Sequence, residues 1–236
     1  MNLKSFKELY LKIVSESKDY YQIKELTKNE YKSKSRFLSS ELKNIWSNSL
    51  KFFKFKRLDR IESDIGLFPV KYSHLSTNKS DINVFVVKRT DNNPDLDEPI
   101  AMLSVYGTNI KIGKNIKLIN KIKIAIVQPK YQGQGIGYAL YKGLIEIEDW
   151  TVMSDDHSKG ARKLWSNLNS DPNISVWLYE SSSTLEARNA FQLKNFDTEI
   201  DKLYNNKNLR LIATKKNSSV DKLLTEFNKL INNSKE

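Results

Sequence analysis

The chain contains no cysteine and only two histidines, His74 and His157, among its 236 residues. The absence of cysteine excludes disulfide bonds, thiolate metal sites and a cysteinyl acyl-enzyme intermediate. A dedicated zinc site is not expected either, because the two histidines lie far apart in the sequence. We therefore expect no bound metal, and any group transfer would have to run directly from donor to acceptor.

Long apolar runs are also missing. No stretch of about 18 apolar residues occurs, so we expect no membrane-spanning segment. Residues 1–8 lack the apolar block of a signal peptide, which favours a cytoplasmic location. Hydrophobic residues make up 39% of the chain and aromatic residues 11%, as is ordinary for a folded protein. A chain of this length can bury one sizeable core.

Positive charge is concentrated at the start of the chain. The net charge is +11, and residues 1–60 hold fifteen Lys and Arg against seven Asp and Glu. Such an excess can attract an acidic partner, either nucleic acid or an acidic protein. Within it, residues 51–57 interleave cations with phenylalanines, as surfaces for single-stranded nucleic acid do. The alternative is a strand that packs Phe53 and Phe55 inward and leaves the lysines in water.

Hydrophobic periodicity predicts the secondary structure. Residues 1–60 form a basic helical extension, with helical stripes at residues 3–15 and, after a Ser40 cap, at residues 42–50. Turns are expected at residues 91–95 and 171–173, and a polar hairpin region between Gly107 and Gly113. The predicted strands are residues 82–88, 100–106, 117–127, 150–153, 174–179 and 209–214. The predicted helices are residues 136–147, 161–168, 185–196 and 218–231, the last with Ser218 and Asp221 spaced as a capping box. Their alternation predicts an α/β fold in which helices flank a mixed sheet.

Three glycines at alternate positions, Gly133, Gly135 and Gly137, join the strand at 117–127 to the helix that follows. A loop of this kind lets backbone N–H groups converge on an anion, and the helix dipole adds partial positive charge. The loop therefore predicts a phosphate or pyrophosphate site. It is not a Walker loop, because no Lys followed by Ser or Thr comes after Gly137. Its spacing also differs from the dinucleotide fingerprint.

The pattern Gln132-x-x-Gly135-x-Gly137, preceded by Val127-x-Pro129-x-Tyr131, resembles the acyl-CoA signature of the GNAT N-acetyltransferase superfamily. The resemblance covers residues 82–180. It implies a GNAT-like mixed, mostly antiparallel central sheet in a domain at residues 61–216, followed by a C-terminal amphipathic helix at 217–236. Residues 154–165 are also similar to acetyltransferase-like sequences encoded by bacteriophages.

The resemblance further implies how acetyl-CoA, the acyl donor, is held. Strands equivalent to residues 117–127 and 150–154 splay apart in this family, and the thioester lies in the gap. Main-chain groups around Ile126 and Val127 bind the pantetheine arm. The pyrophosphate is held by the loop residues Gln132, Gly133, Gln134, Gly135, Ile136, Gly137 and Tyr138.

Catalytic candidates cluster after the strand at 150–153. The resemblance places Asp155, Asp156 and His157 beside the reacting carbonyl, where one of them could deprotonate the incoming amine. The alternative is a solvated turn whose polar side chains cap the next helix. Relatives often carry a glutamate on the central strand, but residues 117–127 contain no acid.

This chain also differs from the family at the residue that would give a proton to the CoA thiolate as it leaves. Relatives often place a tyrosine where this chain has Trp165, and an indole cannot deliver a proton at neutral pH. The thiolate could leave unassisted, or Tyr179 or an unusual arrangement could serve. We therefore expect an N-acetyltransferase with an unknown amine acceptor. The alternative is a non-catalytic nucleic-acid-binding or structural protein on the same scaffold.

Overall fold

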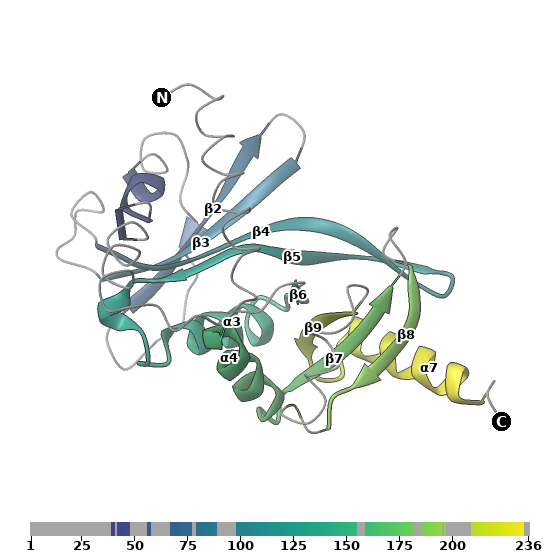
Figure 1. Cartoon of the computed structure of the whole chain (residues 1–236). Helices are drawn as coiled ribbons and strands as arrows, with labels where there is room; N and C mark the ends of the chain where they lie inside the picture. The colour runs from purple at the N-terminus through teal and green to yellow at the C-terminus, as the bar shows by residue number, and fades with distance from the viewer. Residues whose placement is uncertain are drawn as a thin grey trace. The chain divides into compact units, whose positions relative to one another are not determined.

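The computed structural model describes residues 39–40, 42–47, 56–57, 67–76, 79–88, 98–154, 159–181, 186–194, 196 and 209–233 (Figure 1). All of them belong to the unit Phe37–Glu236, which is distinct from residues 1–36. The predicted helix at 3–15 and the turn at 91–95 lie outside the described residues. None of the described helices combines the length and apolar character that a transmembrane span requires.

In the described part of the chain nine strands form one sheet. The sheet is mixed, as the sequence predicts, although the sequence indicated only six of its strands. In spatial order the nine strands are β1-β2-β3-β4-β5-β6-β9-β7-β8. Only the β5–β6 pair is parallel among the described neighbouring strands, and the other pairs are antiparallel. The bounds are β1 Lys56–Arg57, β2 Leu67–Ser76, β3 Lys79–Lys88, β4 Glu98–Ile112, β5 Asn115–Val127, β6 Val152–Ser154, β7 Ile174–Ser181, β8 Ala187–Gln192 and β9 Leu209–Lys215.

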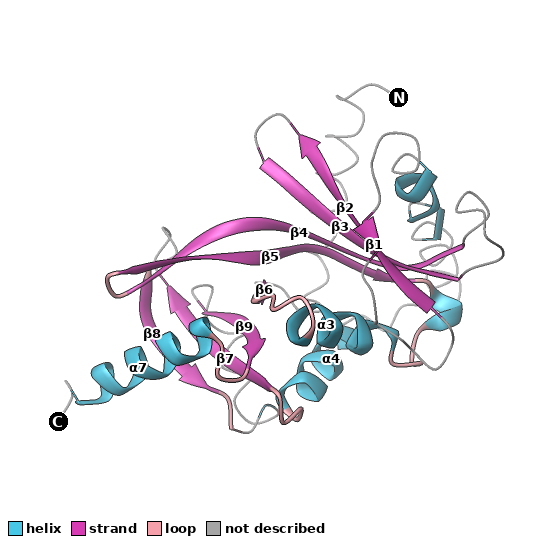
Figure 2. Ribbon diagram, turned by 180° about the vertical axis from the view of Figure 1, so that it is seen from behind, coloured by secondary structure: helices cyan, strands magenta, loops and turns pink. Residues whose placement is uncertain are grey.

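Helices cover both faces of this sheet. Helices α3 (Ile136–Glu146) and α4 (Lys159–Asn169) pack together on one face of the sheet. Figure 2 shows the same pair of helices with the molecule turned by 180°. The other face contacts α7 (Ser219–Asn233) near β7 and β9, and contacts the helical residues 42–47 near β3 and β4. Leu42 and Trp46 are buried there, so this part of the predicted N-terminal extension belongs to the sheet's own core.

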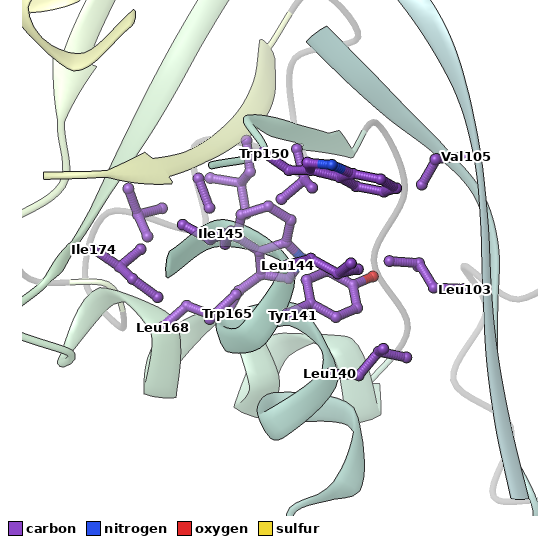
Figure 3. Close-up of a cluster of buried hydrophobic side chains, with 14 of the residues drawn as sticks. Leu103, Val105, Leu140, Tyr141, Leu144, Ile145, Trp150, Trp165, Leu168 and Ile174 are labelled. Carbon is purple, nitrogen blue, oxygen red and sulfur yellow. The ribbon is translucent and has the colours of Figure 1, made fainter. Parts of the chain in front are cut away.

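The period-two pattern of the strands explains why two cores form. In β7, Val176 and Leu178 enter the core beneath α3 and α4, whereas Trp177 and Tyr179 enter the core beneath α7. Successive side chains on a strand point to opposite faces, so an apolar run fills both sides. The α3–α4 core is the larger one and contains the aromatic residues labelled in Figure 3.

Four sequence expectations were wrong in detail. Residues 56–57, within the predicted helical extension at 1–60, form strand β1 and pair with β2. The predicted helix at 185–196 contains strand β8, which pairs with β7 and buries Ala190. Gly107 lies inside β4, so the turn of the β4–β5 hairpin is confined to Gly113 and Lys114. Ser40 is itself helical and therefore does not cap the helix at 42–47. In α7 half of the predicted capping box is present: the Asp221 N–H donates to the Ser218 Oγ at 3.2 Å, but the Asp221 carboxylate accepts from the Asn217 N–H and not from that of Ser218.

Candidate functional site

The glycine loop leads from the end of β5 into α3. A short 3₁₀ turn, Pro129–Tyr131, comes first, and Gly135 is the residue that precedes α3. Gly133 and Gly135 have φ angles of +80° and +78°. A side chain at either position would be strained by this left-handed backbone, although no heavy atom lies within 4 Å of the place where its Cβ would be. The loop is therefore shaped for glycine and leaves open space above its backbone.

Side chains hold this loop against the preceding strand. The Gln132 Nε2 donates to the Val127 carbonyl at 3.0 Å, and the Gln134 Nε2 donates to the Lys130 carbonyl at 3.1 Å. The Lys130 ammonium pairs with the Glu98 carboxylate at 2.6 Å. Both glutamines of the predicted signature thus stabilise the loop through hydrogen bonds to its own backbone.

No side chain caps the start of α3. The first helical hydrogen bond runs from the Ala139 N–H to the Gly135 carbonyl at 2.9 Å. The N–H groups of Ile136, Gly137 and Tyr138 precede it and have no partner within the helix. Together with the helix dipole, these three donors can bind an anion.

Gly137 serves packing rather than backbone conformation. A Cβ at this position would lie 3.1 Å from the Leu164 Cδ1 of α4 and 3.9 Å from the Val127 Cγ2 of β5. Glycine therefore allows the start of α3 to approach both elements closely. The third predicted glycine has a different physical reason from the first two.

Strand β5 pairs with β6 over a short stretch before the loop. The two strands pair only at Asn120 and Lys121, and a bulge in the β4–β5 register falls at Lys123. Beyond it, Ala125 is exposed although its strand lies in the middle of the sheet. Bulges redirect a strand and its side chains, and among the described residues β6 pairs no further along β5.

Alternation along β5 shows which main-chain groups face away from β4. The Gln128 N–H bonds to the Ile100 carbonyl of β4 at 2.8 Å, so Gln128 faces β4. Alternate residues of an antiparallel strand face alternate neighbours, and Ile126 therefore also faces β4. Ala125 and Val127 face away from β4 and have no strand partner there in the described part of the chain. Of the two predicted contacts, Val127 and not Ile126 directs its main chain to the open side.

A buried carboxylate anchors the first two turns of α3. Asp171, whose side chain is 3% exposed, accepts hydrogen bonds from the Tyr138 hydroxyl at 2.5 Å, the Asn173 N–H at 2.9 Å and the Lys142 ammonium. Lys142 also pairs with Glu146 at 2.7 Å. An open pocket of about 330 Å³ adjoins this cluster and is lined by Tyr138, Asn167, Ser170, Asp171 and Pro172.

The same contacts set the protonation states. Burial alone would raise the pKa of Asp171, but the hydrogen bonds from Lys142, Tyr138 and Asn173 outweigh it and hold this pKa below its usual value. Burial would lower the pKa of Lys142, yet its bonds to Asp171 and Glu146 raise it. Burial and the bond to Asp171 both raise the pKa of Tyr138. At neutral pH the carboxylate and ammonium are therefore charged and the phenol is protonated.

Of the catalytic candidates, Trp165 and Tyr179 lie in the described part of the chain. Asp155, Asp156 and His157 lie outside the described residues, directly after the buried Ser154 that ends β6. Trp165 is 1% exposed and is packed within the α3–α4 core. Tyr179 lies on the opposite face, where its hydroxyl donates to the Lys111 carbonyl at 3.2 Å.

Sequence reasoning did not find Asp171. It lies 33 residues after Tyr138, in the turn between α4 and β7, and the sequence marks it only as the start of an Asp-Pro-Asn turn. Within the described residues no group of three or more His, Asp or Glu side chains is placed to hold a metal ion.

Comparisons of the chain with family models, with curated proteins and with solved structures find no match. The function proposed below therefore rests on the geometry of the glycine loop, the start of α3 and the end of β5.

Proposed function

We propose that this protein is an acetyl-CoA-dependent N-acetyltransferase that transfers the acetyl group directly to an amine. One observation carries the proposal: a left-handed glycine loop and an uncapped helix start follow a central strand whose last residues have no described strand partner on the side away from β4. An anion site and an open strand edge are thus adjacent, which suits a ligand with a pyrophosphate at one end and an amide-bearing arm at the other.

The residues present fit such a ligand. The N–H groups of Ile136, Gly137 and Tyr138 would hold the pyrophosphate, and Gly133 and Gly135 leave the space above the loop free of side chains. The pantetheine arm would extend along β5 and bond to the main chain of Ala125 and Val127. The Val127 carbonyl already accepts a hydrogen bond from Gln132, so this side of the strand is accessible to a donor.

The chemistry requires a held thioester, a deprotonated amine and stabilisation of the oxyanion. Direct transfer is proposed, and the chain contains no cysteine that could form a thioester-linked acyl-enzyme. Among the sequence's carboxylates and imidazoles, Asp155, Asp156 and His157 directly follow β6 in the sequence and are the candidates for the base. A non-catalytic protein on the same scaffold would bind CoA without releasing thiol from acetyl-CoA.

Calorimetry with CoA tests the proposed site. Gly135→Asp adds a side chain and a negative charge beside the anion site, so we expect CoA affinity to fall at least about tenfold. Gly113→Asp is a matched control, because Gly113 also has a positive φ, +58°, and also lies in a tight turn. It lies at the other end of β5, roughly 40 Å away along a strand of 13 residues. Unchanged CoA affinity in folded Gly135→Asp would contradict the proposal.

Turnover can be followed with a thiol reagent, which does not react with the protein itself. Because the chain has no cysteine, a thiol reagent reports only the CoA released from acetyl-CoA. We expect thiol release to depend on an added amine, and mass spectrometry of the acceptor should show one acetyl group. CoA binding with no release across a broad panel of amines would favour the non-catalytic alternative.

A further inference from the structure

The turn end of the β4–β5 hairpin exposes large aliphatic side chains. Ile116 is 66% exposed and Leu118 is 72% exposed. They are two residues apart on β5 and therefore lie on the same face of the strand. Aliphatic side chains that are exposed singly need no explanation, but neighbouring ones indicate a surface that contacts something else.

The two faces of this hairpin differ in what covers them. The face with Ile110, Ile112 and Ile119 is buried in the core beneath α7. The other face continues the side of the sheet that carries α3 and α4. Among the described apolar residues on that side of β5, those near the glycine loop pack against the α3–α4 core, whereas Ile116 and Leu118, nearer the turn, stay exposed.

Helix α7 adds to the same end of the molecule. A Cβ at Gly113 would lie 3.9 Å from the Phe227 Cδ2, so α7 passes close to the hairpin turn. Leu230, about one helical turn beyond Phe227, is 69% exposed. Figures 1 and 2 both show the hairpin turn and the end of α7 projecting at the same end of the sheet. The exposed aliphatic side chains therefore gather on two projecting elements.

Positive charge surrounds these side chains. Residues 99–145 contain seven lysines and no Asp or Glu. Three of the lysines, Lys111, Lys114 and Lys117, lie in the hairpin close to its turn, and the first two are exposed. Lys111 pairs with Glu186 at 2.8 Å. A surface with this excess of one sign repels a second copy of itself and attracts an anionic partner.

The exposed side chains narrow the choice of anionic partner. Single-stranded nucleic acid stacks its bases on aromatic rings, whereas Ile116, Leu118 and Leu230 are aliphatic. A bilayer that contains anionic lipids offers both complements, because its headgroups attract ammonium groups and its acyl layer takes up aliphatic side chains. Lysine side chains are long enough to keep their charge at the headgroups while neighbouring residues insert.

We propose that the hairpin end and the end of α7 form a peripheral anchor for an anionic bilayer surface. The anchor consists of Ile116, Leu118, Leu230, Lys114 and Lys117. It lies on the bilayer and does not cross it, and it acts independently of the proposed acetyl transfer. Stable peripheral binding generally takes two signals, here aliphatic insertion and electrostatic attraction. Removal of either signal should therefore release the protein.

Vesicle sedimentation of the full chain tests both signals. We expect binding to phosphatidylcholine vesicles that contain about 30 mol% phosphatidylglycerol at about 0.05 M salt, and release from phosphatidylcholine alone or at high salt. Leu118→Ser should weaken partitioning about fivefold, and its combination with Ile116→Ser more than about tenfold. Ile147→Ser is the matched control, because Ile147 is also exposed, at 51%, but follows the end of α3.

A matched pair of charge reversals tests the electrostatic signal. Lys114→Glu should weaken partitioning into the anionic vesicles several-fold, since each lysine near the surface adds to the attraction. Lys163→Glu makes the same change in net charge at an exposed position of α4 and should have little effect. Equal weakening by both reversals would show that total charge, and not the hairpin, holds the protein on the vesicle, which would overturn the proposal.

A fluorescent probe separates insertion from adsorption through the basic residues 1–60. Because the chain has no cysteine, Leu118→Cys takes up a single environment-sensitive fluorophore. On the anionic vesicles its emission should shift to the blue and be quenched by lipids with a nitroxide on the acyl chain. The same fluorophore at Ile147→Cys should keep its aqueous emission.

Four results would overturn the proposal. The first is no sedimentation of the wild type with the anionic vesicles at low salt. The second is aqueous emission from the probe at position 118 while the protein sediments, since another region then binds. The third is a blue shift without vesicles that grows with protein concentration, which would assign the surface to a second copy. The fourth is a shift with single-stranded nucleic acid and none with vesicles.

Discussion

The Tyr138 hydroxyl, in the first turn of α3, donates a 2.5 Å hydrogen bond to the buried carboxylate of Asp171 in the turn after α4. Lys142, one helical turn further on, donates to the same carboxylate. The helix start that forms the proposed anion site is therefore anchored to a turn 33 residues downstream of Tyr138. Rigid placement of three N–H groups is what a phosphate site requires.

Asp171→Asn should destabilise the fold and weaken CoA binding together. The amide cannot accept as well from Lys142 and Tyr138, and we expect a loss of about 1–3 kcal/mol in the free energy of unfolding. Tyr138→Phe removes one donor and should cost about 1 kcal/mol. Urea unfolding and CoA calorimetry measure the two effects. A destabilised Asp171→Asn variant with wild-type CoA affinity would show that the anchor serves only the fold.

The same contact predicts a pH dependence. The pKa of Asp171 is lower in the folded chain than in the unfolded one, where it is about 3.9. Its contribution to stability is then present above that unfolded value and is lost as the pH falls through the lower, folded value. The free energy of unfolding of the wild type should therefore fall below about pH 4. In Asp171→Asn this part of the fall should be absent when the two proteins are titrated in parallel.

Helix α7 depends on a second buried carboxylate. The Asp221 Oδ1 accepts from the Trp177 Nε1 at 2.9 Å, and the Oδ2 accepts from the Asn217 N–H at 2.8 Å. Asp221→Ala leaves both donors without their partner, so we expect a loss of about 1–3 kcal/mol. Ser218→Ala removes the cap and the hydrogen bond between the Ser218 and Thr214 hydroxyls at 2.9 Å, both without leaving a buried charge unpaired, and should cost about 1 kcal/mol. Equal losses in the two variants, measured by urea unfolding, would argue against the bond to Trp177 as the larger contribution.

Local patterns explain why much of the fold could be predicted. The strand at 117–127, the glycine loop and the helix after it each have their own signal in neighbouring residues, and the mixed α/β sheet follows from the order of such elements. The capping of α7 likewise depends on Ser218 and Asp221, three residues apart. Each of these features needs contacts only within one element or its immediate neighbours.

Features that depend on distant contacts could not be predicted in this way. Strand β8 has a helix-like composition, and its pairing with β7 overrides that preference. The bulge at Lys123 exists only in the register with β4, and Asp171 acquires its role only when α4 packs on α3.

The predicted base remains to be tested by substitution. If Asp155, Asp156 or His157 deprotonates the amine, the responsible alanine variant should lose about 10²–10⁴-fold in turnover and keep its affinity for CoA. The other two variants serve as its controls, because each removes a polar side chain from the same segment. Three variants with wild-type rates would place the base elsewhere and favour the helix-capping alternative.

The basic N-terminal region should bind an acidic partner independently of the cofactor. Residues 1–60 carry an excess of eight positive charges, and Lys54 and Lys56 alternate there with aromatic residues. Contacts to phosphates weaken steeply with salt because counterions are released, whereas a glycine-loop site should respond much less. We therefore expect retention on single-stranded nucleic acid at about 0.05 M salt, lost at higher salt, with acetyl-CoA affinity preserved.

Charge reversal separates this prediction from its alternative. Lys54→Glu with Lys56→Glu should abolish retention, whereas reversal of Lys222 and Lys229 in α7 makes the same change in net charge at exposed positions and should reduce it only slightly. If the region is instead a solvated surface, no retention occurs at low salt and neither pair of reversals has an effect. If both pairs weaken binding equally, net charge and not the N-terminal region is responsible, because a non-specific field depends on total charge.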